Sequence, residues 1–390
     1  MITRIRIRNF KSFRELDLPL TDLNVLVGPN MSGKSNLLDA IRFLVQLLVP
    51  GSDPPLQKAL NDRNGFSEVV WKGASDSIIG FEIEGNTKFG AEPLVFSYLI
   101  ELTGNQYGYG SIRQERLHVD GPSGAGELIS TSNNTRKMRK FNGTVISELQ
   151  DPNSIGLQYP LPDWEASAVR NAISAVRFYN LVPPLMRRLN PSTAAQFLTE
   201  YGDNLSSWLM TLQTRHQAVF SRFRSVSCDV LPNLQDVFTF PTQQSTVFVS
   251  SQEKHLLRPI PLSQMSDGEL VFLAWISLIL SPPELGAGLY CIEEPENHLH
   301  PRLVDALFEL LRQVRAELAQ TPTDRAQLIV TTHSPYVIDK CDIAEIVVVQ
   351  KQHGQSRCTR PSDRGELKEL LKDKSISLGE LYFSGALASA

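Results

Sequence analysis

The sequence predicts an α/β fold, and three observations support this prediction. Residues 23–27 (LNVLV) have the length and composition of a buried strand, and residues 36–48 (NLLDAIRFLVQLL) follow as an amphipathic helix. Two further apolar runs, residues 288–292 (GLYCI) and 327–330 (QLIV), also have the character of buried strands. A helical pattern over residues 300–315 separates them. Buried strands that alternate with helices are typical of a largely parallel sheet.

Composition narrows the class of protein. A chain of 390 residues can hold two or three domains, and 42% hydrophobic with 21% charged residues is ordinary for a globular protein with a sizeable core. The net charge of −4 provides no overall positive field, so any surface for nucleic acid must be local. The four cysteines are widely spaced without a C-x-x-C pair, which argues against a zinc site or a disulfide framework. With no apolar run of membrane-spanning length and no signal peptide, we expect a cytoplasmic protein.

Changes in composition divide the chain into four segments. From about residue 78 the sequence is β-rich with Gly and Asn turns, and from about residue 161 it is helical, interrupted by prolines. The helical part is long enough for a compact lid and too short for coiled-coil arms. Residues 121–143, rich in Ser, Gly and Asn, predict a mobile loop or hairpin tip. The predicted segments are an N-terminal part of the core (1–77), an antiparallel β-lobe (78–160), an inserted helical lid (161–240) and a C-terminal part of the core (241–390).

A glycine-rich turn joins the first buried strand to its helix. Residues 28–35 (GPNMSGKS) fit the pattern G-x-x-x-x-G-K-[ST] in that context, whereas a turn of this composition could also hold nothing. In such a loop the backbone N–H groups and the helix N-terminus surround phosphates. Lys34 would reach the β- and γ-phosphates, and Ser35 would be a ligand of Mg²⁺. The predicted contacts to a nucleoside triphosphate are Asn30, Met31, Ser32, Gly33, Lys34 and Ser35.

Carboxylates follow the strand at residues 288–292. Glu293 and Glu294 stand where the first can hold Mg²⁺ and the second can polarise an attacking water. A solvated acidic turn before the next helix is the alternative interpretation. His333 follows the strand at residues 327–330 and is placed to contact the γ-phosphate or that water, although a lone histidine is more often structural.

Ser266 and Glu269 precede a strongly apolar helix. Together they spell a capping box, S-x-x-E, which is a structural role. A serine at a helix N-terminus can equally bind the γ-phosphate of a nucleotide held by a second subunit. The position of this loop, about two dozen residues before the acidic strand, favours the second role.

These pieces together resemble the ABC-type ATPase family, and more narrowly the branch containing RecF, the SMC proteins and the OLD (overcoming lysogenization defect) ATPases. The opening IRIRNFKSF…LNVLVGPNMSGKSNLLDAI is close to the N-terminus of that branch. SDGEL, CIEEPENHLHP and TTHSP resemble its signature, its Walker B motif with D-loop, and its switch histidine. The resemblance implies a P-loop NTPase with an ABC-type head.

The resemblance also implies roles for single residues. Lys11 would lie near the base or phosphates, Glu293 would hold Mg²⁺, Glu294 would be the catalytic carboxylate and His333 the switch residue. Two identical chains would sandwich two ATP molecules head to tail. The residues acting across that interface would be Ser266 and Gly268 in the signature, and Asn297 and His298 in the D-loop.

Several departures from the family pattern matter. The signature is SDGE rather than SGGQ, and Glu293 stands where most members have Asp. Neither Gln46 nor Gln158 is a convincing Q-loop glutamine, so we expect slow or ligand-dependent turnover. Residues 334–390 contain no D-x-D pair of the kind found in the Toprim domain of OLD nucleases. We therefore expect that the chain is not its own nuclease.

Three functions follow from this interpretation. The first is a regulatory ATPase whose nucleotide state gates a separately encoded effector, a nuclease or toxin, in bacterial anti-phage defence. The second is a RecF-like ATPase that acts on DNA in repair or recombination. The third, a scaffold without hydrolysis, is disfavoured by Glu294 and His333. The candidate DNA contacts are Arg136, Lys137, Arg139 and Lys140, with Arg187 and Arg188 in the lid, although a solvated basic loop is the simpler alternative.

Overall fold

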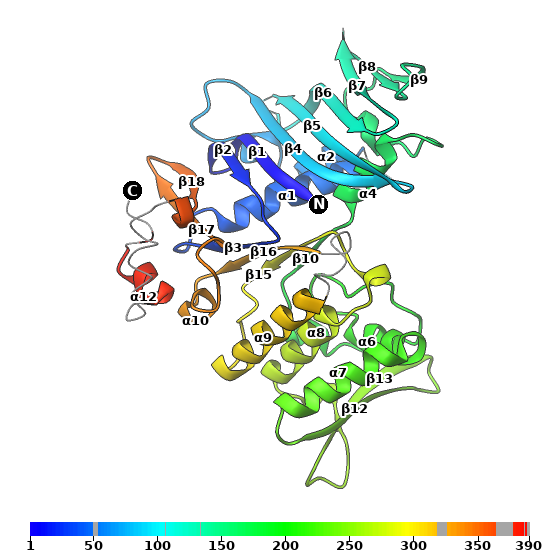
Figure 1. Cartoon of the computed structure of the whole chain (residues 1–390), viewed down its shortest axis with the longest axis vertical. Coiled ribbons are helices and arrows are strands. Elements are labelled where there is room, and N and C mark those ends of the chain that lie inside the picture. The colour runs from blue at the N-terminus through cyan, green and yellow to red at the C-terminus, as the bar shows by residue number, and fades with distance from the viewer. Residues whose placement is uncertain are drawn as a thin grey trace. The chain divides into compact units, whose positions relative to one another are not determined.

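The computed structural model describes residues 1–49, 54–105, 107–132, 134–317, 326–363, 377–385 and 387 (Figure 1). It divides into two compact units. Unit 1 comprises Met1–Val176, Ile343–Asp373 and Ser384–Ala390, and unit 2 comprises Arg177–Asp342 and Lys374–Phe383. Among the described residues, no helix has both the length and the apolar character needed to cross a bilayer.

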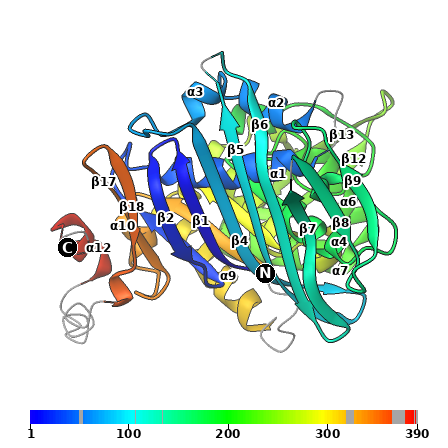
Figure 2. The same cartoon turned by 90° about the horizontal axis from the view of Figure 1, so that it is seen from above.

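An antiparallel sheet of eight strands dominates unit 1, in the order β2-β1-β4-β5-β6-β7-β8-β9 (Figure 2). Apolar and polar residues alternate along β4 and β5, so one face is buried. Because β1 pairs with β4, the lobe predicted over residues 78–160 also includes the first two strands. The strands are β1 (Ile2–Phe10), β2 (Phe13–Pro19), β4 (Ile78–Phe89), β5 (Glu92–Gly104), β6 (Gly110–Gly121), β7 (Gly124–Ser132), β8 (Thr135–Arg139) and β9 (Val145–Leu149).

Residues 121–143 were predicted to be a mobile loop or hairpin tip, and the described part of this segment forms a hairpin, so only the mobile-loop alternative is wrong. Strands β7 and β8 occupy most of this segment, and Arg136 and Met138 point to the buried side of β8. Arg136 is 1% exposed and lies against Glu115, which is 0% exposed. Every second side chain of a strand points to the same face, so a basic side chain on the inner face is buried when a carboxylate in the core pairs with it. Composition alone does not reveal that partner.

A group of three strands in unit 1 carries the phosphate loop. Strand β3 (Leu23–Val27) pairs in parallel with β17 (Ile346–Gln352), which pairs antiparallel with β18 (Gln355–Thr359). Helix α1 (Lys34–Leu48) follows β3, and its Phe43 packs against both Phe10 and Phe81 of the eight-stranded sheet, with ring centroids 5.8 and 5.6 Å away. The remaining helices of the unit are α2 (Pro55–Asn61), α3 (Phe66–Val69) and α4 (Ala166–Ser174).

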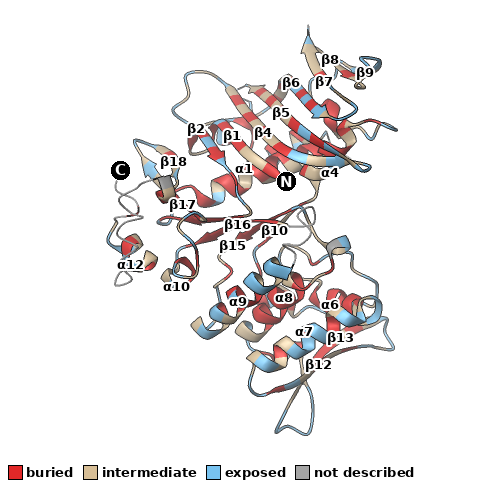
Figure 3. Ribbon diagram, viewed as in Figure 1, coloured by how far each residue is buried: buried red, intermediate tan, exposed pale blue. Residues whose placement is uncertain are grey.

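Unit 2 places helices beside short strands. Strands β15 (Leu289–Glu293) and β16 (Gln327–Thr332) pair in parallel and are buried almost throughout (Figure 3). Helix α8 (Asp267–Ile279) is apolar on nearly every side, and the indole of Trp208 in α6 donates to Ser277 in α8 at 3.0 Å. The other helices are α5 (Pro183–Met186), α6 (Leu205–Arg215), α7 (Gln217–Val230), α9 (Pro301–Glu317), α10 (Pro335–Ile338) and α12 (Leu378–Phe383).

The segment predicted as a helical lid is only partly helical. Strand β10 (Val176–Tyr179) lies beside β15 in the order β10-β15-β16. The sequence did not predict it, because a four-residue segment is too short for its periodicity to distinguish a strand from a helix. Strands β12 (Leu234–Pro241) and β13 (Thr246–Glu253) form a hairpin next to α6 and α7, with the short β11 (Asn190–Pro191) and β14 (Ile260–Pro261) on β13.

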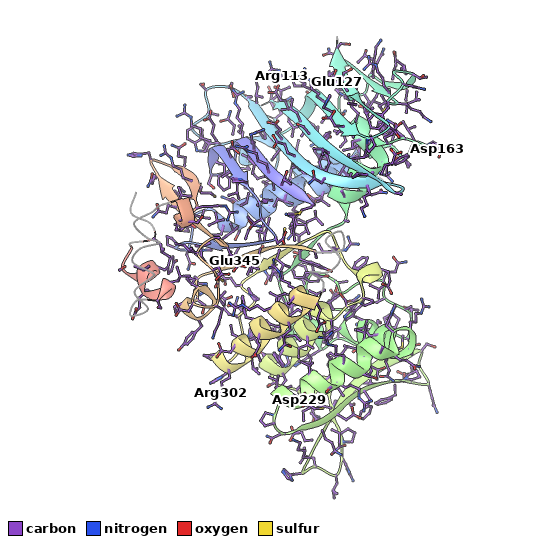
Figure 4. All side chains as sticks on the ribbon, viewed as in Figure 1. Arg113, Glu127, Asp163, Asp229, Arg302 and Glu345 are labelled. Atoms are coloured by element: carbon purple, nitrogen blue, oxygen red, sulfur yellow. The ribbon has the colours of Figure 1, made fainter. Side chains whose placement is uncertain are left out.

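Charged side chains such as Asp229 on α7 and Arg302 on α9 project from the ribbon (Figure 4).

Candidate functional site

Close backbone packing shapes the phosphate loop in unit 1. A Cβ atom on Gly28 would lie 2.2 Å from the carbonyl oxygen of Val349 in β17, so only glycine fits there. Gly33 has a φ of +115°, and a Cβ atom on it would lie 2.3 Å from the hydroxyl of Ser356. The Ser356 hydroxyl donates to the carbonyl of Ser32 at 2.5 Å, and its oxygen lies 2.8 Å from the hydroxyl oxygen of Ser12. Segments from both ends of the chain therefore hold the loop.

The loop has the features of an anion site. The amine of Lys34 donates to the carbonyls of Gly28 and Pro29, at 2.6 and 3.3 Å. No side chain caps the N-terminus of α1, which leaves its first backbone N–H groups for a ligand. The hydroxyl oxygen of Ser32 is buried without a partner. Asn30, Met31 and Ser35 are exposed at the same turn.

Lys11, the predicted base or phosphate contact, is tied to α1. Its amine lies 2.7 Å from the carboxylate of Asp39, which also binds Arg63. Burial raises the pKa of Asp39, but the hydrogen bonds and charges of Arg63 and Lys11 outweigh it, so the pKa is lowered overall. Gln46 accepts from Arg63 at 2.7 Å, which gives this glutamine a structural role in the same cluster.

The acidic strand end and the histidine meet in unit 2. The Nδ1 atom of His333 lies 3.1 Å from one carboxylate oxygen of Glu294, and the amide of Asn297 donates to the other at 3.0 Å. Glu294 has a φ of +43°, which is unfavourable for a residue with a side chain and is held here by its backbone bond to Thr331. Glu293 ends β15 and is half-buried. Glu294, His333 and Asn297, all predicted from the sequence, thus form one cluster.

Glu296 belongs to this cluster and was not predicted from the sequence. The hydroxyl of Thr332 donates to one of its carboxylate oxygens, and the other oxygen is buried without a partner. Thr332 also accepts from the backbone N–H of Ser334, which fixes the turn that carries His333. Burial raises the pKa of Glu296. Its place two residues after Glu294 was the available signal.

The signature loop forms its predicted capping box. The hydroxyl of Ser266 accepts from the backbone N–H of Glu269, and the Glu269 carboxylate accepts from the backbone N–H of Ser266 at 2.9 Å. Ser266 therefore has the structural role of a helix cap. Ser266 and Asp267 are exposed, so the N-terminus of α8 lies at the protein surface. A Cβ atom on Gly268 would lie 2.9 Å from the carbonyl of His298, so the signature and the D-loop are in contact within the unit.

Arg187 is a neighbour of the signature loop rather than part of a free basic surface. Its guanidinium donates to the carbonyl of Met265 and pairs with the carboxylate of Asp267, both at 2.7 Å. The Nδ1 atom of His298 lies 3.8 Å from the other oxygen of Asp267. A DNA contact by Arg187 stays a prediction, whereas the same prediction for Arg136 is wrong because its side chain is 1% exposed.

Two of the remaining candidates for DNA contact already have partners within the protein. Lys137 pairs with Glu148 at 3.2 Å, and Arg139 donates to Ser130 at 2.5 Å. Lys140 is half-buried and Arg188 is exposed.

Gln158 was the other glutamine considered for the Q-loop. Its backbone carbonyl accepts from Arg170, and its side-chain oxygen is buried without a partner.

The donors available for Mg²⁺ are few. Among the described residues, no group of three or more His, Cys, Asp or Glu side chains could hold a metal ion. Mg²⁺ commonly takes one or two protein oxygens and completes its shell with phosphates and water. The exposed hydroxyl of Ser35 and the half-buried carboxylate of Glu293 are oxygen donors of the right kind.

Two family models match the chain. A model described as an AAA ATPase domain matches residues 1–83, which include the phosphate loop. A model described as an AAA domain, putative AbiEii toxin, Type IV TA system, matches residues 201–339. The second range includes the signature loop, the acidic strand end and His333.

Curated relatives cover the chain to different extents. The Old nuclease of Escherichia phage P2 is 22% identical over 404 residues, which cover 98% of this chain and 64% of that protein. The DNA replication and repair protein RecF of Proteus mirabilis is 50% identical over 45 residues, 11% of this chain and 12% of RecF. The chain thus spans less than two thirds of the length of these curated relatives.

Solved structures share the fold. The SmcHead bound to the C-winged helix domain of ScpA matches with a TM-score of 0.56 at 14% identity, covering 92% of this chain and 97% of that one. The Smc head domain with a coiled coil and joint from Pyrococcus yayanosii matches with a TM-score of 0.53 at 11% identity, covering 96% and 99%. At these identities the likeness concerns the fold alone.

Proposed function

We propose that the chain is an ABC-type ATPase of the RecF, SMC and OLD branch, whose head fold it shares, and that it hydrolyses ATP in a homodimer. The observation that carries this proposal is the cluster of Glu294, His333 and Asn297. A carboxylate held by a histidine and an amide, on a strained backbone at the end of a buried strand, is arranged for work on a water molecule.

The proposed roles follow from the contacts of each side chain. Glu294 would orient the attacking water and accept its proton, and His333 would hold the carboxylate in place and contact the γ-phosphate. Lys34 would leave the carbonyls of Gly28 and Pro29 for the β- and γ-phosphates. Ser35 and Glu293 would hold Mg²⁺, which when bound neutralises charge on the phosphates.

Dimerisation would complete each site. Ser266 and Gly268 lie at the exposed N-terminus of α8, where a phosphate of a nucleotide bound to a second copy would gain from the backbone N–H groups and the helix dipole. Asn297 and His298 would lie at the same interface. Binding energy from two nucleotides would then drive association.

Three variants test this proposal. Glu294→Gln should keep nucleotide binding, lower the hydrolysis rate about 10²- to 10⁴-fold and accumulate the ATP-bound dimer. Lys34→Ala should weaken nucleotide binding and remain a monomer. Glu309→Gln, which removes an exposed carboxylate of α9, is the matched control and should behave as wild type. Phosphate release and mass photometry measure both properties, and wild-type turnover by Glu294→Gln would refute the assignment.

We further propose that the nucleotide state gates an effector in anti-phage defence. The description of the family model that matches residues 201–339 and the likeness to a phage-encoded OLD nuclease support this role. The RecF-like alternative is supported by a short match to RecF, while the burial of Arg136 and the pairing of Arg187 weaken it. Turnover measured with and without double-stranded DNA separates the two, because only the RecF-like role requires DNA to stimulate hydrolysis.

A further inference from the structure

The signature loop carries negative charge where the proposed dimer would bring a phosphate. Asp267 and Glu269 both lie in the first turn of α8. The Glu269 carboxylate is occupied by the backbone and hydroxyl of Ser266, both at 2.9 Å. The Asp267 side chain is 48% exposed, beside Ser266 and Gly268. An unpaired carboxylate at this position would repel an arriving triphosphate.

Arg187 supplies the compensating charge from a different element. It follows α5, and one nitrogen of its guanidinium bridges the Asp267 carboxylate and the carbonyl of Met265, each at 2.7 Å. The side chain is 24% exposed, so the pair is at the surface without being fully solvated. His298 faces the same carboxylate at 3.8 Å. The neighbouring Arg188 is exposed, which gives a matched cation in the same turn.

We propose that Arg187 is a positioning residue of the composite ATP site, one that makes the acidic signature SDGE compatible with a phosphate. It neutralises Asp267 and fixes the backbone that leads into Ser266. This role rests on the proposed function, because it requires a nucleotide from a second copy to bind at Ser266 and Gly268. In a signature without the aspartate, no such cation would be needed.

The inference makes a prediction about rescue. In the Glu294→Gln background, adding Arg187→Ala should raise the ATP concentration for half-maximal dimerisation about 10- to 100-fold, as expected for loss of a charge-assisted bond. Asp267→Asn should restore dimerisation in the presence of Arg187→Ala, because no charge then remains to be neutralised. Arg188→Ala is the control and should leave the midpoint unchanged. Binding of a fluorescent ATP analogue to the monomer should be the same in all variants.

Mass photometry across an ATP titration distinguishes the outcomes. A midpoint unchanged by Arg187→Ala would overturn the role of Arg187. A loss that Asp267→Asn fails to rescue would also overturn it, because a purely structural role predicts that result. If Glu294→Gln alone stayed monomeric at every ATP concentration, the proposed function would fail and this role with it. Thermal unfolding of each variant checks that the units remain folded.

Discussion

The buried pair of Glu115 and Arg136 allows a stability prediction worked from its contacts. One oxygen of Glu115 accepts from the backbone N–H of Gly156 at 2.6 Å and lies 3.6 Å from the Nε of Arg136. The other accepts from the N–H of Leu157 and from the hydroxyl of Tyr98, both at 3.0 Å. Burial raises the pKa of Glu115, while the two backbone bonds and the Arg136 charge oppose that rise.

Glu115→Gln keeps the size of the side chain and removes its charge. Whichever way the amide turns, its NH₂ group faces a backbone N–H donor, so at least one hydrogen bond is lost. Arg136, 1% exposed, is left as an uncompensated buried cation. Breaking a buried pair in this way costs about 3–5 kcal/mol. For a unit of this size that corresponds to a fall in Tm of about 6–20 °C.

Thermal unfolding by differential scanning calorimetry measures the loss. Lys137 lies next to Arg136 on β8 and pairs with Glu148 on β9, and Lys137→Ala, which breaks this surface pair, should cost less than about 1 kcal/mol. Replacing both buried partners, by Glu115→Leu with Arg136→Met, should recover most of the stability, since no charge then remains buried. A Glu115→Gln protein within about 1 kcal/mol of wild type would refute the argument that Arg136 needs this carboxylate.

Two other predictions concern the sites. Burial raises the pKa of Glu296 above its ordinary value of 4.5, so its contribution to stability is complete below that pH and is lost as pH rises through the raised value. Glu296→Gln should therefore match wild type in Tm below pH 4.5 and exceed it at pH 8, and identical Tm profiles over this range would contradict the prediction. Gly28→Ala places a methyl group 2.2 Å from the Val349 carbonyl and should weaken nucleotide binding at least about tenfold, measured with a fluorescent analogue. Gly126→Ala, where nothing lies within 4 Å, is its control.

Local patterns predicted the parts of the site that local geometry determines. The phosphate loop and the capping box of Ser266 depend on residues within a few positions of one another, so a spaced pattern contains the whole arrangement. Glu294 and His333 were predicted because each ends an apolar strand, and parallel strands bring such ends together.

The missed features depend on partners far away in the chain. Arg136 has the same local sequence whether it meets solvent or Glu115, and only the packing of β6 against the neighbouring strands decides which. Arg187 likewise pairs with a residue whose position in space the sequence does not give. Burial of a charge is therefore the property that composition predicted least well.

The serine contacts around the phosphate loop have a consequence for synthesis of the protein. The loop is translated early, yet Ser356, which bonds to Ser32, lies 324 residues later in the chain. At roughly 5–20 residues per second, about 15–65 s would separate the two on the ribosome. Strand β17, against which Gly28 packs, is equally late. A nascent chain would therefore complete its nucleotide pocket only after Ser356 has been synthesised, and shorter chains would lack the contact that holds the loop.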